Sequence, residues 1–187
     1  MAVLRQIALL GNPVLRTPAK AVAFPLSDEV RALIEDMAAT MREADGVGIA
    51  APQVHQSLAI FIVAPRPNPR YPDAVEQPPI VAINPEILER SPEKVAGWEG
   101  CLSIPGLRGE VPRHRRILAR YRDPRGAEVV REFEGFAARV FQHEDDHLRG
   151  VVFLDRMESL RGLACEREYA RRVAEGSPGV VNARPSS

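Results

Sequence analysis

The chain has 187 residues, of which 45% are hydrophobic and 27% are charged. These values are ordinary for a soluble globular protein, and the length suits one domain with a substantial core. The 25 Lys and Arg residues balance the 25 Asp and Glu residues, so the net charge gives no direct indication of a nucleic-acid partner. No apolar run is long enough to cross a membrane, and the first residues lack the hydrophobic segment of a signal peptide.

The cysteine content points to a reducing compartment. Cys101 and Cys165 are the only cysteines, which is too few for a disulfide framework, so we expect a cytoplasmic protein. In that setting a single cysteine is either a small buried hydrophobe or a functional thiolate. We expect residues 1–175 to form one catalytic domain and residues 176–187 to be a flexible C-terminal tail.

The first clear element is a helix that follows an irregular segment. Prolines and glycines interrupt residues 1–26, which predicts irregular structure there. Ser27 suits the N-cap of a helix over about residues 28–44, because its side chain can accept a hydrogen bond from a free N–H of the first turn. Apolar residues recur along this helix at helical spacing, namely Val30, Leu33, Ile34, Met37 and Met41.

Small residues, short apolar runs and a proline-rich loop follow. Residues 46–53 contain two glycines and two alanines, so a backbone or a ligand can approach this stretch closely. Residues 58–63 and 80–83 are apolar runs of β type, which predict two buried strands, the second ended by Asn84-Pro85. Six prolines predict an exposed loop over residues 64–79.

The remaining pattern indicates strands and then helices. Ser91-Pro92 predicts a break, and a short strand is expected at residues 94–98. Two further strands are expected at residues 115–122 and 127–133, joined by a hairpin turn at residues 123–126. A helix is expected to begin at Gly135 and to end at Gly150, and a less regular helical segment spans about residues 158–174.

The helix expected between Gly135 and Gly150 carries the pattern H-E-x-x-H, at His143, Glu144 and His147. Residues four apart in a helix project from nearly the same face, so the two imidazoles can hold one metal ion, with Glu144 beside it as a base. Two solvated histidines on a polar helix face are the competing interpretation. Phe136 and Val140 share the stripe of both histidines, which favours a stripe that points toward the core.

A catalytic site of this type needs a third protein ligand and one open position. One metalloprotease class takes a histidine six residues after the second histidine, but Phe153 occupies that position here. A second class takes a glutamate from a following helix, and Glu166 and Glu168 keep that alternative open. The better candidate is Cys101, because of a resemblance that extends along most of the chain.

The chain resembles the peptide deformylases. That family has three ordered motifs, G-x-G-x-A-A-x-Q, E-G-C-x-S and Q-H-E-x-D-H, and they stand here complete at residues 46–53, 99–103 and 142–147. The resemblance covers roughly residues 5–157 and implies an α+β fold, with antiparallel strands packed around a central metal-binding H-E-x-x-H helix. It also implies an enzyme that removes the N-formyl group from the formylmethionine of newly synthesised peptides and releases formate.

The resemblance further implies a role for each matching residue and for the metal. The expected metal ligands are Cys101, His143 and His147; the expected catalytic groups are Glu144, Gln53 and the backbone N–H of Leu102; the expected substrate-binding residues are Gly46, Val47, Gly48, Glu99, Phe136 and Val140. The metal is expected to be Fe²⁺, which Zn²⁺, Ni²⁺ or Co²⁺ can replace. The expected partners are N-formyl-methionyl nascent peptides near the ribosome, with no membrane contact.

The residue types support this chemistry independently. A metal ion held by one thiolate and two imidazoles can acidify a water molecule toward a pKa of about 7. Glu144 would take the proton of the attacking water and return it to the departing amine. Gln53 and the Leu102 N–H would stabilise the charge on the formyl oxygen. We also expect Glu99 to pair with Arg113 and thereby support the site.

Two other functions are weighed against the deformylase. An ordinary zinc endoprotease would tolerate replacement of Cys101, whereas a deformylase would lose its metal. A non-catalytic protein with a closed structural metal site would not need Glu144, so this residue favours catalysis.

Overall fold

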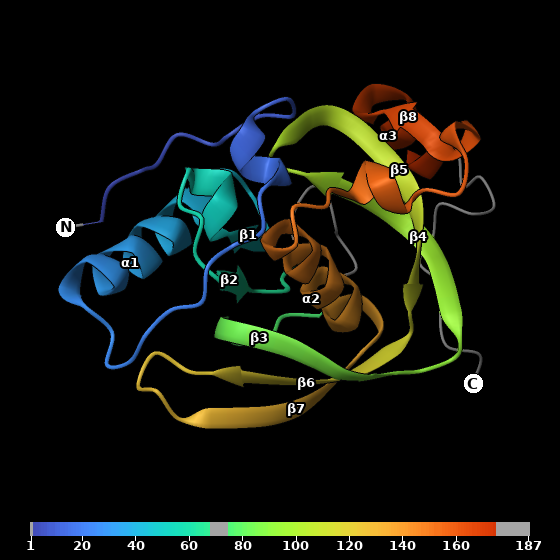
Figure 1. Cartoon of the computed structure of the whole chain (residues 1–187). Coiled ribbons are helices and arrows are strands. Elements are labelled where there is room, and N and C mark those ends of the chain that lie inside the picture. The colour runs from blue at the N-terminus through green and yellow to red at the C-terminus, as the bar shows by residue number, and fades with distance from the viewer. Residues whose placement is uncertain (1, 68–74, 175–187) are drawn as a thin grey trace.

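A computed structural model describes residues 2–67 and 75–174. Its strands form two antiparallel sheets, of order β1-β2-β3-β6-β7 and β4-β5-β8 (Figure 1). The first sheet contains β1 (Gly48–Ala50), β2 (Ile60–Val63), β3 (Ile80–Arg90), β6 (Arg116–Arg122) and β7 (Glu128–Glu134). The second contains β4 (Lys94–Cys101), β5 (Ile104–His114) and β8 (Leu163–Cys165).

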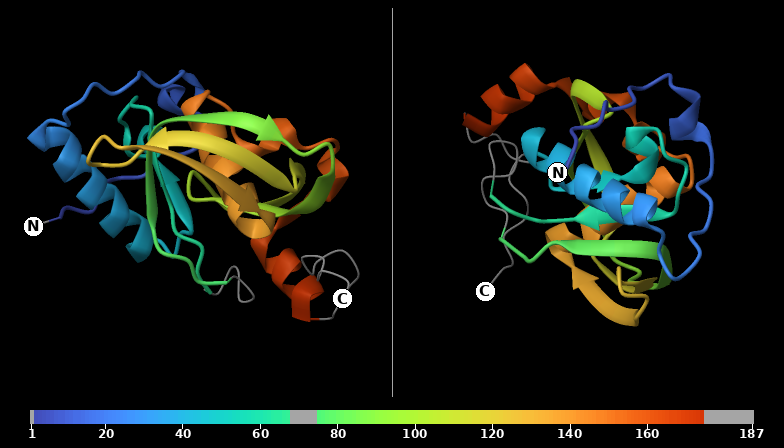
Figure 2. Two further views of the ribbon diagram at one scale, coloured as in Figure 1. Left: turned by 90° about the horizontal axis from the view of Figure 1, so that it is seen from below. Right: turned by 90° about the vertical axis from the view of Figure 1, so that its left-hand side faces the viewer.

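Helix α2 (Gly135–Leu148) lies between the two sheets and contacts strands of both (Figures 1 and 2). Every residue from Ala137 to Leu148 is buried. Phe141 is fully buried, with its ring centroid 4.8 Å from those of Phe61 and Phe133. The predicted α+β fold with antiparallel strands around the H-E-x-x-H helix is confirmed. Because the helix is enclosed, its polar side chains must find their partners inside the protein.

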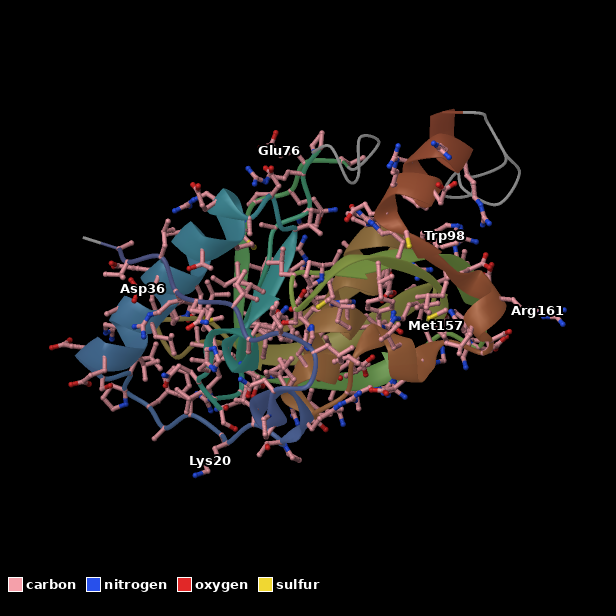
Figure 3. All side chains as sticks on the ribbon, turned by 90° about the horizontal axis from the view of Figure 1, so that it is seen from above. Lys20, Asp36, Glu76, Trp98, Met157 and Arg161 are labelled. Atoms are coloured by element: carbon pink, nitrogen blue, oxygen red, sulfur yellow. The ribbon has the colours of Figure 1, made fainter. Side chains whose placement is uncertain are left out.

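Helix α1 (Asp28–Glu43) packs on the far side of β1 and β2 from α2 (Figure 2). The predicted N-cap is confirmed, because the Ser27 Oγ accepts from the Val30 N–H at 3.4 Å. The N-terminal segment is tied to the outer side of this helix through Asp36 (Figure 3). Asp36 accepts from the Val3 N–H at 2.6 Å and pairs with the Arg5 guanidinium at 2.7 Å.

The irregular N-terminal segment then reaches the elements that carry the motifs at residues 46–53 and 99–103. The Ala8 N–H donates to the Gln53 carbonyl and the Leu10 N–H to the Ser103 carbonyl, each at 2.8 Å. Short 3₁₀ turns complete this part and the C-terminal part of the fold: η1 (Pro13–Arg16), η2 (Ala51–Val54), η3 (Phe153–Arg156) and η4 (Leu160–Gly162). These backbone contacts fix the loops beside α2 from outside.

Two expectations about secondary structure are wrong, and one strand was missed. β3 does not end at Asn84-Pro85 but continues to Arg90 across a register shift, and the Asn84 side chain exchanges two 2.8 Å hydrogen bonds with the Val22 backbone. β5 was not predicted. Within residues 158–174, where a helix was expected, the chain forms η4 and β8 before helix α3 (Glu166–Ala174).

Helix α3 packs against the second sheet. The Tyr169 ring lies 5.2 Å from Trp98 on β4, at the opposite end of the molecule from Asp36 (Figure 3). None of the helices within the described residues is long and apolar enough to cross a membrane. The expected tail, residues 176–187, and the middle of the expected 64–79 loop lie outside the described residues.

Candidate active site

Three buried side chains converge where β4 meets α2. Cys101 ends β4, and His143 and His147 lie one turn apart on α2. One potential ligand atom from each lies within 4.8 Å of the others, and the Cys101 Sγ is 3.2 Å from the His147 Nε2. The two imidazole centroids are 5.0 Å apart. The structure therefore brings together the three residues that the sequence nominated as metal ligands.

This group of donors fits a divalent transition metal. The His143 Nδ1 is 2.9 Å from the Glu99 carboxylate, which leaves the other ring nitrogen for a metal, the usual arrangement for a ligating histidine. Burial lowers the pKa of His147 well below its ordinary value, so this imidazole is neutral, as a ligand must be. One thiolate and two imidazoles suit Zn²⁺, Fe²⁺, Co²⁺ and Ni²⁺.

The groups around His143 favour a positive charge at this position. Burial disfavours a charged His143, but hydrogen bonds to Cys101 and Glu99 outweigh this and raise the pKa of His143 well above its ordinary value. The imidazolium would then sit between a sulfur and a carboxylate. These same groups would attract a divalent cation, which supports the assignment of the centre to a metal.

Glu99 is the hub of a buried ion-pair network behind His143. Its carboxylate accepts two hydrogen bonds from Arg113, both 2.9 Å, and a third from the Arg139 Nη1 at 2.9 Å. Burial alone would raise the pKa of Glu99, but the charge and hydrogen bonds of Arg113 dominate and lower it. Arg113 also donates to Asp146 at 2.6 Å. The expected Glu99–Arg113 pair is confirmed, and Glu99 is fixed in the ionised form that His143 needs.

Arg139 is a residue that the sequence did not single out. Its guanidinium donates to Glu99 and to three backbone carbonyls, those of Val95 at 2.6 Å, Val111 at 2.8 Å and Gly97 at 3.2 Å. A Cβ at Gly97 would lie only 2.8 Å from Arg139. Arg139 therefore joins α2 to β4 and β5 through polar groups that would otherwise be buried without partners. The signal in the sequence was its position four residues before His143, on the same helix face.

Glu144 lies in the same buried region, next to strand β1. Burial raises its pKa from 4.5 to about 7, and its Oε2 has no hydrogen-bond partner among the described residues. A Cβ at Gly48 would be 2.3 Å from the Glu144 Oε1, so only glycine leaves room for this carboxylate. A buried carboxylate with a free oxygen and a pKa near neutrality is suited to accept and return a proton.

Gln53 and Leu102 lie next to Cys101. The Gln53 Nε2 lies 3.2 Å from the Ser103 Oγ and 3.5 Å from the Cys101 Sγ, while its Oε1 accepts from the Ala50 N–H at 2.8 Å. The amide orientation follows from these contacts, which leave the NH₂ group facing Cys101. Leu102 lies in the turn directly after Cys101, so its backbone is fixed next to the same sulfur.

A small cavity of about 40 Å³ connects these groups. Eleven of the twelve residues nominated from the sequence line this cavity. The exception is His147, which lies behind Cys101. The lining residues are Gly46, Val47, Gly48, Gln53, Glu99, Cys101, Leu102, Phe136, Val140, His143 and Glu144, together with Asp45, Gly100 and Arg139, which were not nominated. The apolar and polar parts of the site thus share one cavity.

Comparison with known proteins agrees with the geometry. The family model described as polypeptide deformylase matches residues 4–162. Peptide deformylase 2 of a Nostoc species is 50% identical over 171 residues, covering 91% of this chain and 96% of the relative. Peptide deformylase 2 of Shewanella oneidensis is 48% identical over 152 residues, covering 81% of this chain and 83% of the relative.

Solved structures give the same result. A class I type b peptide deformylase from Acinetobacter baumannii, crystallised with Met-Ala-Ser bound, superposes with a TM-score of 0.82 at 46% identity, covering 84% of this chain and all of that chain. A peptide deformylase from Thermotoga maritima gives a TM-score of 0.76 at 43% identity, covering 84% of this chain and 99% of the other.

Fold and site define a hydrolase built around a candidate metal centre on a buried helix. The chain belongs to the peptide deformylase family, the hydrolases that remove the N-formyl group from nascent peptides. The predicted family, fold and enzyme class are confirmed.

Proposed function

We propose that this chain hydrolyses the N-formyl group of formyl-methionyl peptides, with Cys101, His143 and His147 as the metal ligands and Glu144 as the catalytic base. The observation that carries the proposal is the convergence of these four side chains in one buried site, where one Glu144 carboxylate oxygen has no hydrogen-bond partner among the residues that the structure describes. A closed structural metal site would not need this fourth group.

We propose Fe²⁺ as the metal in cells, with Zn²⁺, Ni²⁺ or Co²⁺ able to replace it. The mixed thiolate and imidazole donors support this range. When bound, the ion supplies a Lewis acid that polarises the formyl carbonyl and acidifies water.

Glu144 moves the proton in this scheme. With a pKa of about 7, its carboxylate can accept a proton from the attacking water at neutral pH and hold it until the C–N bond breaks. The proton then passes to the departing amine, and formate leaves. Its burial keeps other water away from the proton during the transfer.

Gln53 and the Leu102 N–H are the proposed donors to the oxygen that becomes negative during attack. The contacts of Gln53 with Ala50, Cys101 and Ser103 fix its amide before the substrate arrives. Such preorganised donors each contribute roughly 3–4 kcal/mol to transition-state stabilisation.

The peptide is proposed to bind along β1. Among the described residues this strand is at the edge of its sheet and pairs with β2 alone, so an extended peptide can add to its free side at Gly48 and at Gly46 and Val47 just before it. Phe136 and Val140, on α2, would contact the methionine side chain. The Met-Ala-Ser complex of the Acinetobacter relative supports a substrate that begins with methionine.

The substrate also suggests where the protein works. Formyl-methionine occurs at the start of newly made chains, so we propose a cytoplasmic enzyme that acts close to the ribosome. We further propose that residues 1–175 act as one catalytic domain.

Product analysis of N-formyl-Met-Ala-Ser tests the proposal against an endoprotease. The deformylase should produce formate and intact Met-Ala-Ser, and Cys101→Ala should lose both the metal and the activity. Cleavage between the amino acids, or a Cys101→Ala variant that keeps its metal and its rate, would contradict it.

A further inference from the structure

A second cavity lies on another face of α2, separate from the candidate active site. Its volume is about 230 Å³, which is room for several water molecules at about 30 Å³ each. It is bounded by the end of β3, the start of β4, the end of β5, the C-terminal half of α2 and η3. Nothing in the proposed reaction uses it.

The walls of this cavity carry an excess of positive charge. Five cationic side chains line it, namely Arg90, Lys94, Arg113, Arg149 and Arg156. Two carboxylates, Asp145 and Asp146, line it as well, so five positive charges against two negative ones leave three. Glu99, which does not line the cavity, engages Arg113 from behind and reduces the local excess to two.

The side-chain carboxylates and the amide in the walls are already engaged. Asp145 accepts from Arg149 at 2.9 Å, and Asp146 accepts from Arg113 and Arg156, each at 2.6 Å. The Gln142 amide is bonded in both directions to the backbone of His114, at 3.1 and 2.9 Å.

Several donors, by contrast, are free. Neither Arg90 nor Lys94 has a side-chain hydrogen bond or an ion pair with any residue that the structure describes. Arg149 and Arg156 bind their carboxylates through Nε and Nη2, so the Nη1 of each makes no hydrogen bond to the part of the chain that is described. The cavity therefore presents free cationic donors and engaged acceptors, which matches a ligand that only accepts hydrogen bonds.

We propose that this second cavity binds a phosphate group. A phosphate group offers oxygens in several directions, so it can bind several of these donors at once, and free phosphate also carries more charge than a carboxylate; arginine is well suited to this role. The group could belong to free inorganic phosphate or to the backbone of a single-stranded RNA. The net charge of the whole chain is zero, so such binding would be local to this cavity.

Binding is measured on the metal-loaded protein, with inorganic phosphate in one series and a short oligouridylate in the other, at constant ionic strength. The test variant is Arg90→Gln with Lys94→Gln, two exposed residues without partners. The matched control is Arg31→Gln with Arg172→Gln, which removes the same charge from exposed positions on α1 and α3. Neither pair lies in the candidate active site, and the readout does not depend on deformylase activity.

We expect the test variant to bind phosphate at least tenfold more weakly than wild type, and the control to bind as wild type does. If the oligouridylate also binds, its titration is repeated at several salt concentrations, and its affinity should fall with salt less steeply in the test variant, because fewer phosphates are neutralised. If phosphate alone binds, free phosphate is the ligand. Binding of neither ligand, or binding that is equal in the test and control variants, would overturn the proposal.

Discussion

Replacing Gly48 by alanine should disable the proposed base without disturbing the metal ligands. The new Cβ would lie 2.3 Å from the Glu144 Oε1, 2.8 Å from its Cδ and 3.0 Å from its Cγ. Since ordinary contacts begin at 3.4 Å, the Oε1 would have to move by about 1.1 Å, the difference between 3.4 and 2.3. Rotation of the carboxylate cannot relieve the contact, because the Cδ and Cγ are also too close. A displacement of about 1 Å typically costs on the order of 100-fold in rate.

The assay is formate release from N-formyl-Met-Ala-Ser, with the metal content of each sample measured in parallel. We expect kcat of Gly48→Ala to fall about 100-fold at unchanged metal content. Gly46→Ala is the matched control in the same loop, since its Cβ would meet Leu102 at 3.1 Å and Met41 at 3.2 Å rather than Glu144. Its kcat should fall far less. A Gly48→Ala enzyme with a kcat close to wild type would refute the assignment of Glu144 as the base held by this contact.

Three further predictions concern the surroundings of the site. Arg139→Met should weaken zinc binding about 10- to 100-fold, measured by chelator competition, because Glu99 loses one of its partners. Arg120→Met, which removes an exposed surface ion pair, should leave zinc binding unchanged. Equal zinc affinities in the two variants would contradict the role of Arg139 in supporting the metal site. In metal-free protein, the raised pKa of Glu144 favours folding below pH 4.5, and that contribution is lost as the pH rises through about 7. Urea unfolding at pH 5 and pH 8 should therefore show wild type losing about 2.5 kcal/mol relative to Glu144→Gln. Parallel pH profiles of the two proteins would argue against the raised pKa of Glu144. Phe141→Ala should lower the free energy of unfolding by about 3–5 kcal/mol, because it leaves a cavity between the sheets; a loss below about 1 kcal/mol would show that the helix packs differently.

The parts of the fold that could be predicted are those with strong local patterns. Helix α2 follows from apolar residues at helical spacing, and the same spacing places His143 and His147 on one face. The hairpin of β6 and β7 follows from two strand candidates around a turn sequence, and its register is regular from end to end. In these elements neighbouring residues carry the signal, so no tertiary information is needed.

The missed strands depend on partners that are distant in sequence. β5 contains Pro105, Gly106, Gly109 and Pro112, which weaken any local β pattern. It forms because it pairs with β4 along most of its length. β8 is only three residues long and forms through its pairing with β5. The pairs are Leu107–Cys165, Arg108–Ala164 and Gly109–Leu163. Tertiary context overrides local propensity in both cases.

The same limit explains what was missed in the site. His143, Glu144 and His147 were recognisable by residue type and spacing, whereas Cys101 and the other nominated residues came from the resemblance to the family. All of them lie in or directly behind one cavity. Arg139 was not recognised because its partners are backbone carbonyls on β4 and β5, which no sequence pattern places next to α2. The contact between Gly48 and Glu144 was likewise hidden, since the two residues are 96 positions apart (144 minus 48).

The most direct test of the central proposal is formate release by wild type and Glu144→Ala at equal, full metal occupancy, with protein loaded anaerobically with Fe²⁺ or with Ni²⁺. The structure predicts turnover of a formyl-methionyl peptide by wild type and a loss of at least about 100-fold in the variant, with the metal still bound. Absence of turnover in fully loaded wild type, or equal rates in both proteins, would contradict the proposed reaction and its base.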